Sequence, residues 1–422
     1  MRKDSTGGLA RLARVSALAA SAVGLGLVAL STTAASADSV TLKWYMWSGS
    51  DAETAAWRHV ADMVTAKYPD IKIDLATSAW PDYWTKLPTL AASNTLPDIV
   101  SLQSLRAPGF SSLMVPLDDR VARDKFDIAS FDKSIVGGLS HDGKVFALPY
   151  DFGPLLIYYN ADLFAKAGLP APKAGWTVAD FIKDAKALTS GSQYGTSLGG
   201  VDQVVAWAAS AGAAYMKGDE LDLTNPKFVA AFQSYVDLVA KEKVAPVLAA
   251  SGGMQLGTVS LGRFAAGDVA MVIDGPWQLI NLKSSVKFKI GLAPLPVGPA
   301  GSITVSAGSG FGVSTTSKHP EEVWKAVQIL TGPEAEQYLA SQGRGFAARV
   351  AYQKYWYDVA ANGVENGPAA LDAAQKGALP YVTTPNWNTV NNLFEQYQPL
   401  AMNGSQTAAQ VLDTITKQLA AQ

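Results

Sequence analysis

Residues 40–78 read VTLKWYMWSGSDAETAAWRHVADMVTAKYPDIKIDLATS, and this stretch decides the expected fold class. Residues 40–47 alternate and are rich in strand-forming side chains, and the small residues 48–50 break the strand. Ser50 and Glu53 have the spacing of a capping box, which predicts that a helix begins there. Residues 71–75 alternate again as a second strand. Strands that alternate with helices predict a mostly parallel α/β sheet, in which a ligand binds beyond the carboxyl ends of the strands.

The rest of the chain continues this alternation of elements. Strands are expected at 98–102, 143–150, 155–160, 269–273 and 303–313, with residues 151–154 interrupting the second of them. Helices are expected around 83–92 and 177–188, and others begin at Asn225, Pro320 and Pro333. The helix that begins at Pro320 is expected to carry Trp324 on its surface.

Composition excludes several classes of protein. The 422 residues are 48% hydrophobic, 17% charged and 9% aromatic, which rules out a disordered, collagen-like or polytopic membrane protein. The formal charge of −2 argues against a nucleic-acid partner. The chain has no Cys, so thiolate metal sites, disulfides and Cys nucleophiles are excluded. Its three His are far apart, and no metal site or cofactor is expected.

Residues 1–37 have the pattern of a secretory signal peptide. A basic start is followed by an apolar run from Val15 to Leu30, and the A-x-A sequence at residues 35–37 predicts cleavage after Ala37. A transmembrane anchor is the alternative, but a 16-residue run is short for the roughly 30 Å of a bilayer core. Without a Cys after the apolar run, the protein is not expected to be a lipoprotein. We expect an extracytoplasmic protein.

Catalytic motifs are missing from the sequence. It lacks a nucleophile elbow, a P-loop, a dinucleotide loop and a zinc-protease motif. Asp151 and Asp274 have the residue type of a glycosidase pair, although ligand contacts or loop caps account for them better.

Aromatic residues beside small polar ones are the main functional signal. Trp47 precedes Ser48, Trp80 lies close to Trp84, and Trp277 follows the predicted strand 269–273. Flat rings bury the C–H faces of a sugar, and carboxylates bind its hydroxyls through charge-assisted hydrogen bonds. Sugar binding is therefore the favoured interpretation.

Five motifs resemble the bacterial extracellular solute-binding proteins of the maltose-binding type, the receptors of ABC sugar importers. The most specific is residues 264–277, FAAGDVAMVIDGPW, which is similar to the family pattern F-x-x-G-x-x-A-M-x-x-x-G-P-W. The others are residues 96–100, residues 142–149 followed by 156–160, residues 303–314, and residues 375–387.

The resemblance implies a two-lobed α/β fold of the type II periplasmic-binding class, in which each lobe has a mixed sheet flanked by helices and a hinge joins the lobes. Lobe one would comprise residues 38–148 and 309–352, and lobe two residues 149–305 and 353–422. The crossovers would lie near 147–153, 303–309 and 350–360.

The resemblance also implies which residues contact the ligand in the cleft. They are Trp47, Ser48, Trp80, Gln103, Asp151, Trp277, Ser309 and Arg344, with Trp207, Asp274 and Trp387 as further candidates. Arg344 could instead be a loop residue paired with a surface acid, and Arg344 and Arg106 leave an anionic ligand open.

The implied function is capture of a sugar or oligosaccharide by hinge closure and its delivery to ABC transporter permease subunits. No catalysis is expected, and the protein is expected to be a monomer. The alternatives are a secreted carbohydrate-active enzyme and a glycan-binding module. The sequence leaves the identity of the sugar open.

Overall fold

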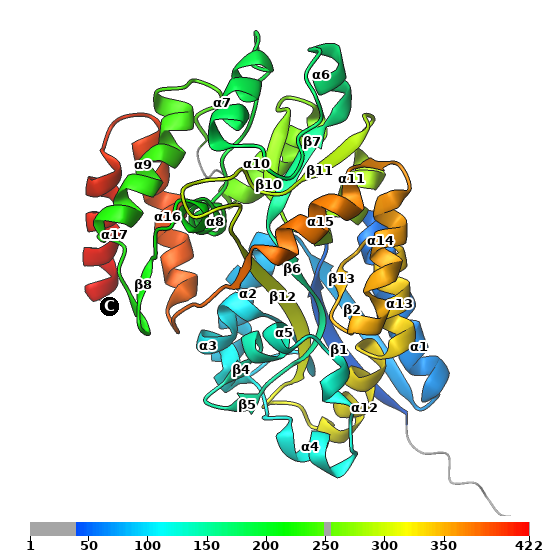
Figure 1. The fold of residues 1–422 in the computed structure, drawn as a ribbon. Helices are drawn as coiled ribbons and strands as arrows, with labels where there is room; N and C mark the ends of the chain where they lie inside the picture. The colour runs from blue at the N-terminus through cyan, green and yellow to red at the C-terminus, as the bar shows by residue number, and fades with distance from the viewer. Residues whose placement is uncertain (1–38, 249–254, 422) are drawn as a thin grey trace, which may run out of the picture. The chain divides into compact units, whose positions relative to one another are not determined.

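The structure, a computed structural model, describes residues 39–248 and 255–421, which form two main β-sheets (Figure 1). The predicted signal peptide and its cleavage site lie outside the described residues. Within the described residues, no helix is both long enough and apolar enough to cross a bilayer.

The larger sheet has seven strands. Its order is β13-β6-β12-β3-β1-β2, and β15 also pairs with β12. The strands are β1 (Val40–Trp47), β2 (Ile71–Ser78), β3 (Ile99–Gln103), β6 (Leu148–Pro154), β12 (Thr304–Val313), β13 (Phe346–Ala347) and β15 (Ala378–Pro380). β1 is parallel to β2 and β3, but β12 runs antiparallel to β3 and β6. The expectation of a mostly parallel sheet is therefore wrong beyond the first three strands, because β12 lies between β3 and β6 and runs opposite to both.

The smaller sheet has four strands in the order β10-β7-β11-β14. They are β7 (Leu156–Asn160), β10 (Met271–Asp274), β11 (Ile290–Ala293) and β14 (Val364–Glu365). β7 is antiparallel to both of its neighbours, and β11 is parallel to β14. Two further pairs are small hairpins, β4 (Ser140–His141) with β5 (Lys144–Val145), and β8 (Met216–Lys217) with β9 (Glu220–Leu221).

The chain passes between the two main sheets four times. Only Leu155 separates β6 from β7, and the other passages join β11 to β12, β13 to β14 and β14 to β15. The first two passages lie side by side, since Leu155 N donates to Val305 O at 3.0 Å and Thr304 Oγ1 donates to Leu155 O at 2.8 Å. The predicted interruption at residues 151–154 is wrong, because pairing with β12 keeps this segment in β6. The proposed lobe boundaries remain a prediction.

Helices cover both sheets. They are α1 (Asp51–Lys67), α2 (Trp80–Ala92), α3 (Ala107–Phe110), α4 (Asp118–Arg123), α5 (Lys133–Gly138), α6 (Ala161–Lys166), α7 (Val178–Ala187), α8 (Val201–Ser210), α9 (Pro226–Ala240), α10 (Leu256–Ala266), α11 (Leu279–Ser285), α12 (Pro320–Leu330), α13 (Pro333–Ser341), α14 (Gln353–Ala361), α15 (Gly367–Lys376), α16 (Trp387–Met402) and α17 (Ala408–Ala420). The short 3₁₀ helices η1 (Ser104–Arg106) and η4 (Pro276–Gln278) follow β3 and β10.

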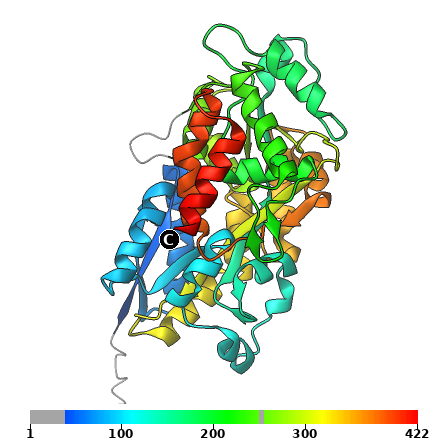
Figure 2. The same ribbon diagram turned by 90° about the vertical axis from the view of Figure 1, so that its left-hand side faces the viewer.

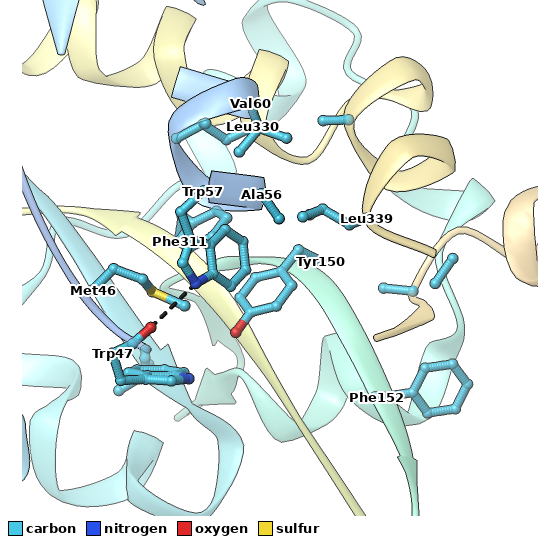
Figure 3. Close-up of a cluster of buried hydrophobic side chains, with 14 of the residues drawn as sticks. Met46, Trp47, Ala56, Trp57, Val60, Tyr150, Phe152, Phe311, Leu330 and Leu339 are labelled. Atoms are coloured by element: carbon cyan, nitrogen blue, oxygen red, sulfur yellow. Dashed lines mark hydrogen bonds between the residues drawn. The ribbon is translucent and has the colours of Figure 1, made fainter. Parts of the chain in front are cut away.

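Two hydrophobic clusters form the core. The first lies around the seven-stranded sheet, where Trp57, Tyr150 and Phe311 pack together (Figure 3). The second lies among α8, α9, α16 and α17, and the last two helices run beside α9 (Figures 1 and 2). Trp324 belongs to the first cluster and is 1% exposed, so its expected surface position is wrong. Its indole N–H reaches Asp124 Oδ2 at 2.6 Å, which lets an apolar ring sit inside while its polar edge remains bonded.

Candidate functional site

Three buried charges form a network at the edge of the seven-stranded sheet. Arg344 follows α13, and its Nε lies 2.5 Å from Glu53 Oε1 while its Nη1 lies 3.0 Å from Asp151 Oδ2. Ser309 N donates to the other Asp151 oxygen at 3.0 Å. The guanidinium also lies over the Trp57 ring at 4.6 Å. We call Glu53, Asp151 and Arg344 the Arg344 network.

Burial and neighbouring charges shift the pKa values in this network in opposite directions. Burial raises the pKa of Asp151 to about 6, although Arg344 and the Ser309 N–H act in the opposite direction. Burial by itself disfavours the Arg344 cation, but the charges of Glu53 and Asp151 outweigh it and raise the Arg344 pKa. The arginine therefore stays charged with a carboxylate on each side.

Glu53 reaches Arg344 because the expected capping box is only half formed. Ser50 Oγ accepts from Glu53 N at 3.1 Å, as predicted for the start of α1. The Glu53 carboxylate, however, accepts from Gly49 N at 2.7 Å through Oε2, and its Oε1 faces Arg344. The same carboxylate thus orders the loop after β1 and neutralises a buried cation.

A second buried arginine lies among indole rings. Arg106, at the end of η1 and 4% exposed, lies 4.3 Å from the Trp84 ring centroid and 5.3 Å from that of Trp80. Its Nη1 donates to Gln103 Oε1, and its Nε donates to Asn388 Oδ1 at 3.3 Å. This cation is therefore bound by amide oxygens and aromatic faces.

Contacts close a ring around Arg106. Trp80 Nε1 donates to Gln255 Oε1 at 3.1 Å, and the next residue, Leu256, donates its N–H to Glu395 Oε2 at 2.6 Å. Glu395 lies on α16, seven residues after Asn388, so both side chains project from similar faces of that helix. The ring joins η1 and α2 to α10 and α16. We call it the Arg106 site, defined by Trp80, Trp84, Arg106, Gln255, Asn388 and Glu395.

Two buried donors beside this site have no hydrogen-bond partner in the described part of the chain. They are Trp84 Nε1 and Asn391 Nδ2, whose residues are 2% and 6% exposed. Unsatisfied buried donors are rare in folded proteins, and a bound molecule is one way to satisfy them.

Three carboxyl groups in this region have raised pKa values. Burial raises the pKa of Glu395 to about 7 and that of Asp274 to about 7, and the negative charge of Asp202 contributes to both shifts. Burial also raises the pKa of Asp202, while the charge of Arg106 lowers it. Burial of Arg106 lowers its own pKa to about 10, and the negative charge of Asp202 acts in the opposite direction.

Asp274 shapes the turn that carries Trp277. Its Oδ1 accepts from Gly275 N at 2.7 Å and from Trp277 Nε1 at 3.0 Å. The turn continues into η4, where Pro276 packs so closely on Gly153 that a Cβ on that glycine would lie 2.4 Å from Pro276 Cγ. The turn after β10 therefore touches β6 two residues beyond Asp151.

The structure brings most of the expected site residues near one edge of the seven-stranded sheet. Trp47 and Trp80 have ring centroids 5.0 Å apart, Gln103 contacts Arg106, and Ser309 pairs with both Gln103 and Asp151 in the sheet. Ser48 Oγ is bonded within its own loop, where it donates to Ser50 O and accepts from Thr54 Oγ1. Arg344 has a buried pair of acids as partners, whereas the alternative interpretation gave it a surface acid.

Trp207 and Trp387 lie elsewhere, in the second hydrophobic cluster. The Trp207 N–H bonds Ser234 Oγ at 2.9 Å, and the Trp387 ring packs on Tyr215 and Tyr381.

The predicted site residues did not include Trp84, Asp202, Asn388 or Glu395. Trp84 was noted only as a neighbour of Trp80, and Arg106 only as a possible anion contact. One available signal was the i, i+4 spacing of Trp80 and Trp84, which places both rings on one face of a helix. In the described residues, no group of three or more His, Asp or Glu side chains is arranged to hold a metal ion.

Comparison with known proteins identifies the family. The model of the bacterial extracellular solute-binding protein family matches residues 48–337. A lactose-binding protein of Rhizobium radiobacter is 29% identical over 264 residues, which are 60% of each chain. An arabinooligosaccharide-binding protein of Bacillus subtilis is 26% identical over 276 residues, 63% of this chain and 62% of that protein. The chain thus aligns with about three fifths of the length of these two relatives.

Solved structures show the same fold. The ABC substrate-binding protein Lmo0181 of Listeria monocytogenes, in complex with cycloalternan, aligns over 91% of this chain and 100% of its own with a TM-score of 0.82 and 24% identity. Maltose-bound T. maritima MalE3 aligns over 90% of this chain and 99% of its own with a TM-score of 0.76 and 24% identity. The expected two-lobed α/β fold of the type II periplasmic-binding class is confirmed. Sequence and fold agree, and the chain belongs to the bacterial extracellular solute-binding protein family.

Proposed function

We propose that this protein captures a sugar or oligosaccharide outside the cytoplasm and delivers it to an ABC transporter. The observation that carries the proposal is the Arg106 site, where indole rings lie beside buried groups that still have hydrogen-bonding capacity. Aromatic rings match the C–H faces of a sugar, and polar groups match its hydroxyls. The named relatives, which bind lactose and arabinooligosaccharide, support the same ligand class.

Binding would proceed by hinge closure. Trp80 and Arg106 follow strands of the larger sheet, whereas Gln255, Asn388 and Glu395 lie on or beside α10 and α16. A ligand that contacts both sides stabilises the closed form, because only that form offers all of the contacts. The closed protein would then dock, as a monomer, on the permease subunits.

Catalysis is not part of the proposal. Of the two carboxyls with glycosidase character, Asp151 has one oxygen on Arg344 and the other on Ser309 N, and Asp274 Oδ1 holds a turn. Both arrangements serve the structure of the protein. Chromatography of oligosaccharides after incubation with the protein tests this point, and released product would contradict it.

A calorimetric panel tests the proposed function. The full mature chain is titrated with lactose, maltotriose, mannotriose and arabinotriose, and we expect saturable binding of at least one. Trp80→Ala should weaken that binding at least about tenfold, since stacked rings and their hydrogen bonds contribute well over 1 kcal/mol. Trp176→Phe is the control, because Trp176 lies in the second cluster with its N–H on Pro294 O. Equal weakening by both changes, or no binding across the panel, would contradict the proposal.

Export is part of the same proposal. We expect the secreted protein to begin at Asp38 and to carry no lipid, and N-terminal sequencing with intact mass of the secreted chain would test both expectations.

A further inference from the structure

The two buried arginines near the candidate site are already engaged. Arg344 has a carboxylate on each side, at 2.5 Å and 3.0 Å. Arg106 donates to the amide oxygens of Gln103 and Asn388, and the Trp84 ring covers it. Neither cation stands as an unoccupied receptor for an anionic ligand.

Three acids in or beside the Arg106 site, Asp202, Glu395 and Asp274, accept hydrogen bonds from neutral donors. Tyr381 Oη donates to Asp202 Oδ1 at 2.9 Å, Leu256 N donates to Glu395 Oε2 at 2.6 Å, and the indole of Trp277 donates to Asp274 Oδ1 at 3.0 Å. In residues 39–248 and 255–421, no Lys, Arg or His forms an ion pair with any of these three carboxyls. Arg106 interacts electrostatically with Asp202, and Asp202 in turn with Glu395 and Asp274, so the local charge is negative whenever the three carboxyls are ionised.

Each of these acids has only a few charged or titratable neighbours among the described residues. Asp202 interacts electrostatically with Arg106, Tyr381 and Tyr215, Glu395 with Asp202 and Tyr235, and Asp274 with Asp202 and Tyr158. Asp202 is in the first turn of α8, where a carboxylate stabilises the helix end. That role does not apply to Asp274, which is the last residue of β10, or to Glu395, which lies inside α16.

Unpartnered donors give an independent indication of what the site accepts. Trp84 Nε1 and Asn391 Nδ2 need an oxygen acceptor, while the carboxylates need hydrogen donors. A hydroxyl group is both, so a polyhydroxylated molecule satisfies the two sets together. A ligand carboxylate or phosphate supplies acceptors alone and adds negative charge beside buried carboxylates, which is unfavourable at low dielectric.

We infer, on the basis of the proposed function, that the site selects sugars without an acidic group and rejects aldonic acids, uronic acids and phosphodiesters of similar size. Selection against the wrong ligand would come from like-charge repulsion, which lowers the affinity for the competitor without adding any contact to the preferred ligand.

A matched pair of open-chain sugars isolates the effect of charge. Lactitol and lactobionate share a galactose unit and an opened second ring, and they differ in that one ends in an alcohol and the other in a carboxylate. Maltitol and maltobionate form a second pair. We expect each aldonate to bind the full mature chain at least about tenfold more weakly than its alditol at pH 8, by calorimetry. Equal or tighter binding of the aldonates, or tight binding of glycerophosphocholine, would overturn the inference.

Thermal denaturation without ligand provides a second test. Asp274→Asn and Glu395→Gln each remove one partly buried negative charge, so we expect each to raise Tm at pH 8 and to change it little at pH 4. Glu334→Gln, at an exposed position of α13, is the control. Lower or unchanged Tm for both site variants at pH 8 would overturn the inference.

The two tests separate the inference from the proposed function. If no sugar binds but Tm rises at pH 8, the proposed function fails while the negative character of the site stands. If acidic sugars bind better than neutral ones, a sugar-binding function stands and the inference fails.

Discussion

Arg344 and Arg106, two of the buried arginines, have similar aromatic surroundings and different partners. Arg344 lies 4.6 Å from the Trp57 ring and Arg106 lies 4.3 Å from the Trp84 ring. Two carboxylates neutralise Arg344, whereas Arg106 has two amide oxygens. Among the described residues, Arg344 Nε makes no hydrogen bond but is in ion-pair contact with Glu53, whereas Trp84 Nε1 and Asn391 Nδ2 have neither kind of partner, so the Arg106 site keeps more capacity for a further partner. We therefore propose that the first region serves stability and the second serves ligand recognition.

The largest expected effect is on stability, from Arg344→Met. The change leaves the carboxyls of Glu53 and Asp151 buried without a cation, which typically costs about 3–5 kcal/mol. Urea unfolding monitored by circular dichroism measures it. Adding Glu53→Gln and Asp151→Asn to this variant should restore part of the loss. A loss below about 1 kcal/mol in the single variant would show that the network is not a stabilising unit.

The pH dependence of stability comes next. Asp274 and Glu395 have folded pKa values of about 7, above the ordinary range, so folding favours their protonated forms. Their contribution to the free energy of unfolding is complete below about pH 4. It is lost as the pH rises toward 7, and the loss is on the order of 2 kcal/mol. Urea unfolding at pH 5 and pH 8 should show the decrease, and Asp274→Asn should reduce it. A wild-type stability that rises over this range while that variant shows the same slope would refute the assignment.

Arg106→Met should separate the two regions by function. The variant loses a cation that forms no ion pair with a carboxylate in the described residues, so we expect stability to change by only about 1 kcal/mol. Ligand affinity should fall at least about tenfold, because the base of the site between Trp80 and Trp84 is lost. Calorimetry with the sugar identified in the panel measures the second effect. A destabilisation as large as that of Arg344→Met, with affinity retained, would reverse the roles assigned to the two arginines.

The smallest expected effect is that of Gln255→Ala. The change removes the oxygen that accepts from the Trp80 N–H, and this hydrogen bond joins α2 to the start of α10. Loss of one such hydrogen bond costs about 1 kcal/mol, so we expect affinity to fall about two- to fivefold with little change in Tm. An unchanged affinity would show that this contact does not contribute to the closed form.

Local patterns predicted local structure well. β1 has the bounds expected from alternation, and the capping box at Thr177 and Asp180 begins α7 as its residues indicate. The motif at residues 264–277 gives a helix that ends at Gly267 with φ +85, followed by β10 and the turn of Trp277. Each of these features is determined by residues close together in the chain.

Features that depend on distant residues could not be read from the sequence. Residues 151–154 include a glycine and a proline and resemble a break, but pairing with β12 keeps them in β6. Glu53 has capping-box spacing, yet its partner is Arg344, 291 positions away in the chain, since 344 minus 53 is 291. Asn388 and Glu395 join the candidate site because α16 packs near η1, and no local pattern marks that contact.

The contact between Gly153 and Pro276 constrains how specificity can change in this molecule. Because there is no room for even a methyl group at that point, the turn bearing Trp277 and the strand bearing Asp151 are as near to each other as the Pro276 ring allows. Evolution toward a smaller ligand therefore cannot draw these segments closer, and it would have to lengthen side chains. Accommodation of a larger ligand is easier, since truncating a single ring opens space without disturbing the scaffold.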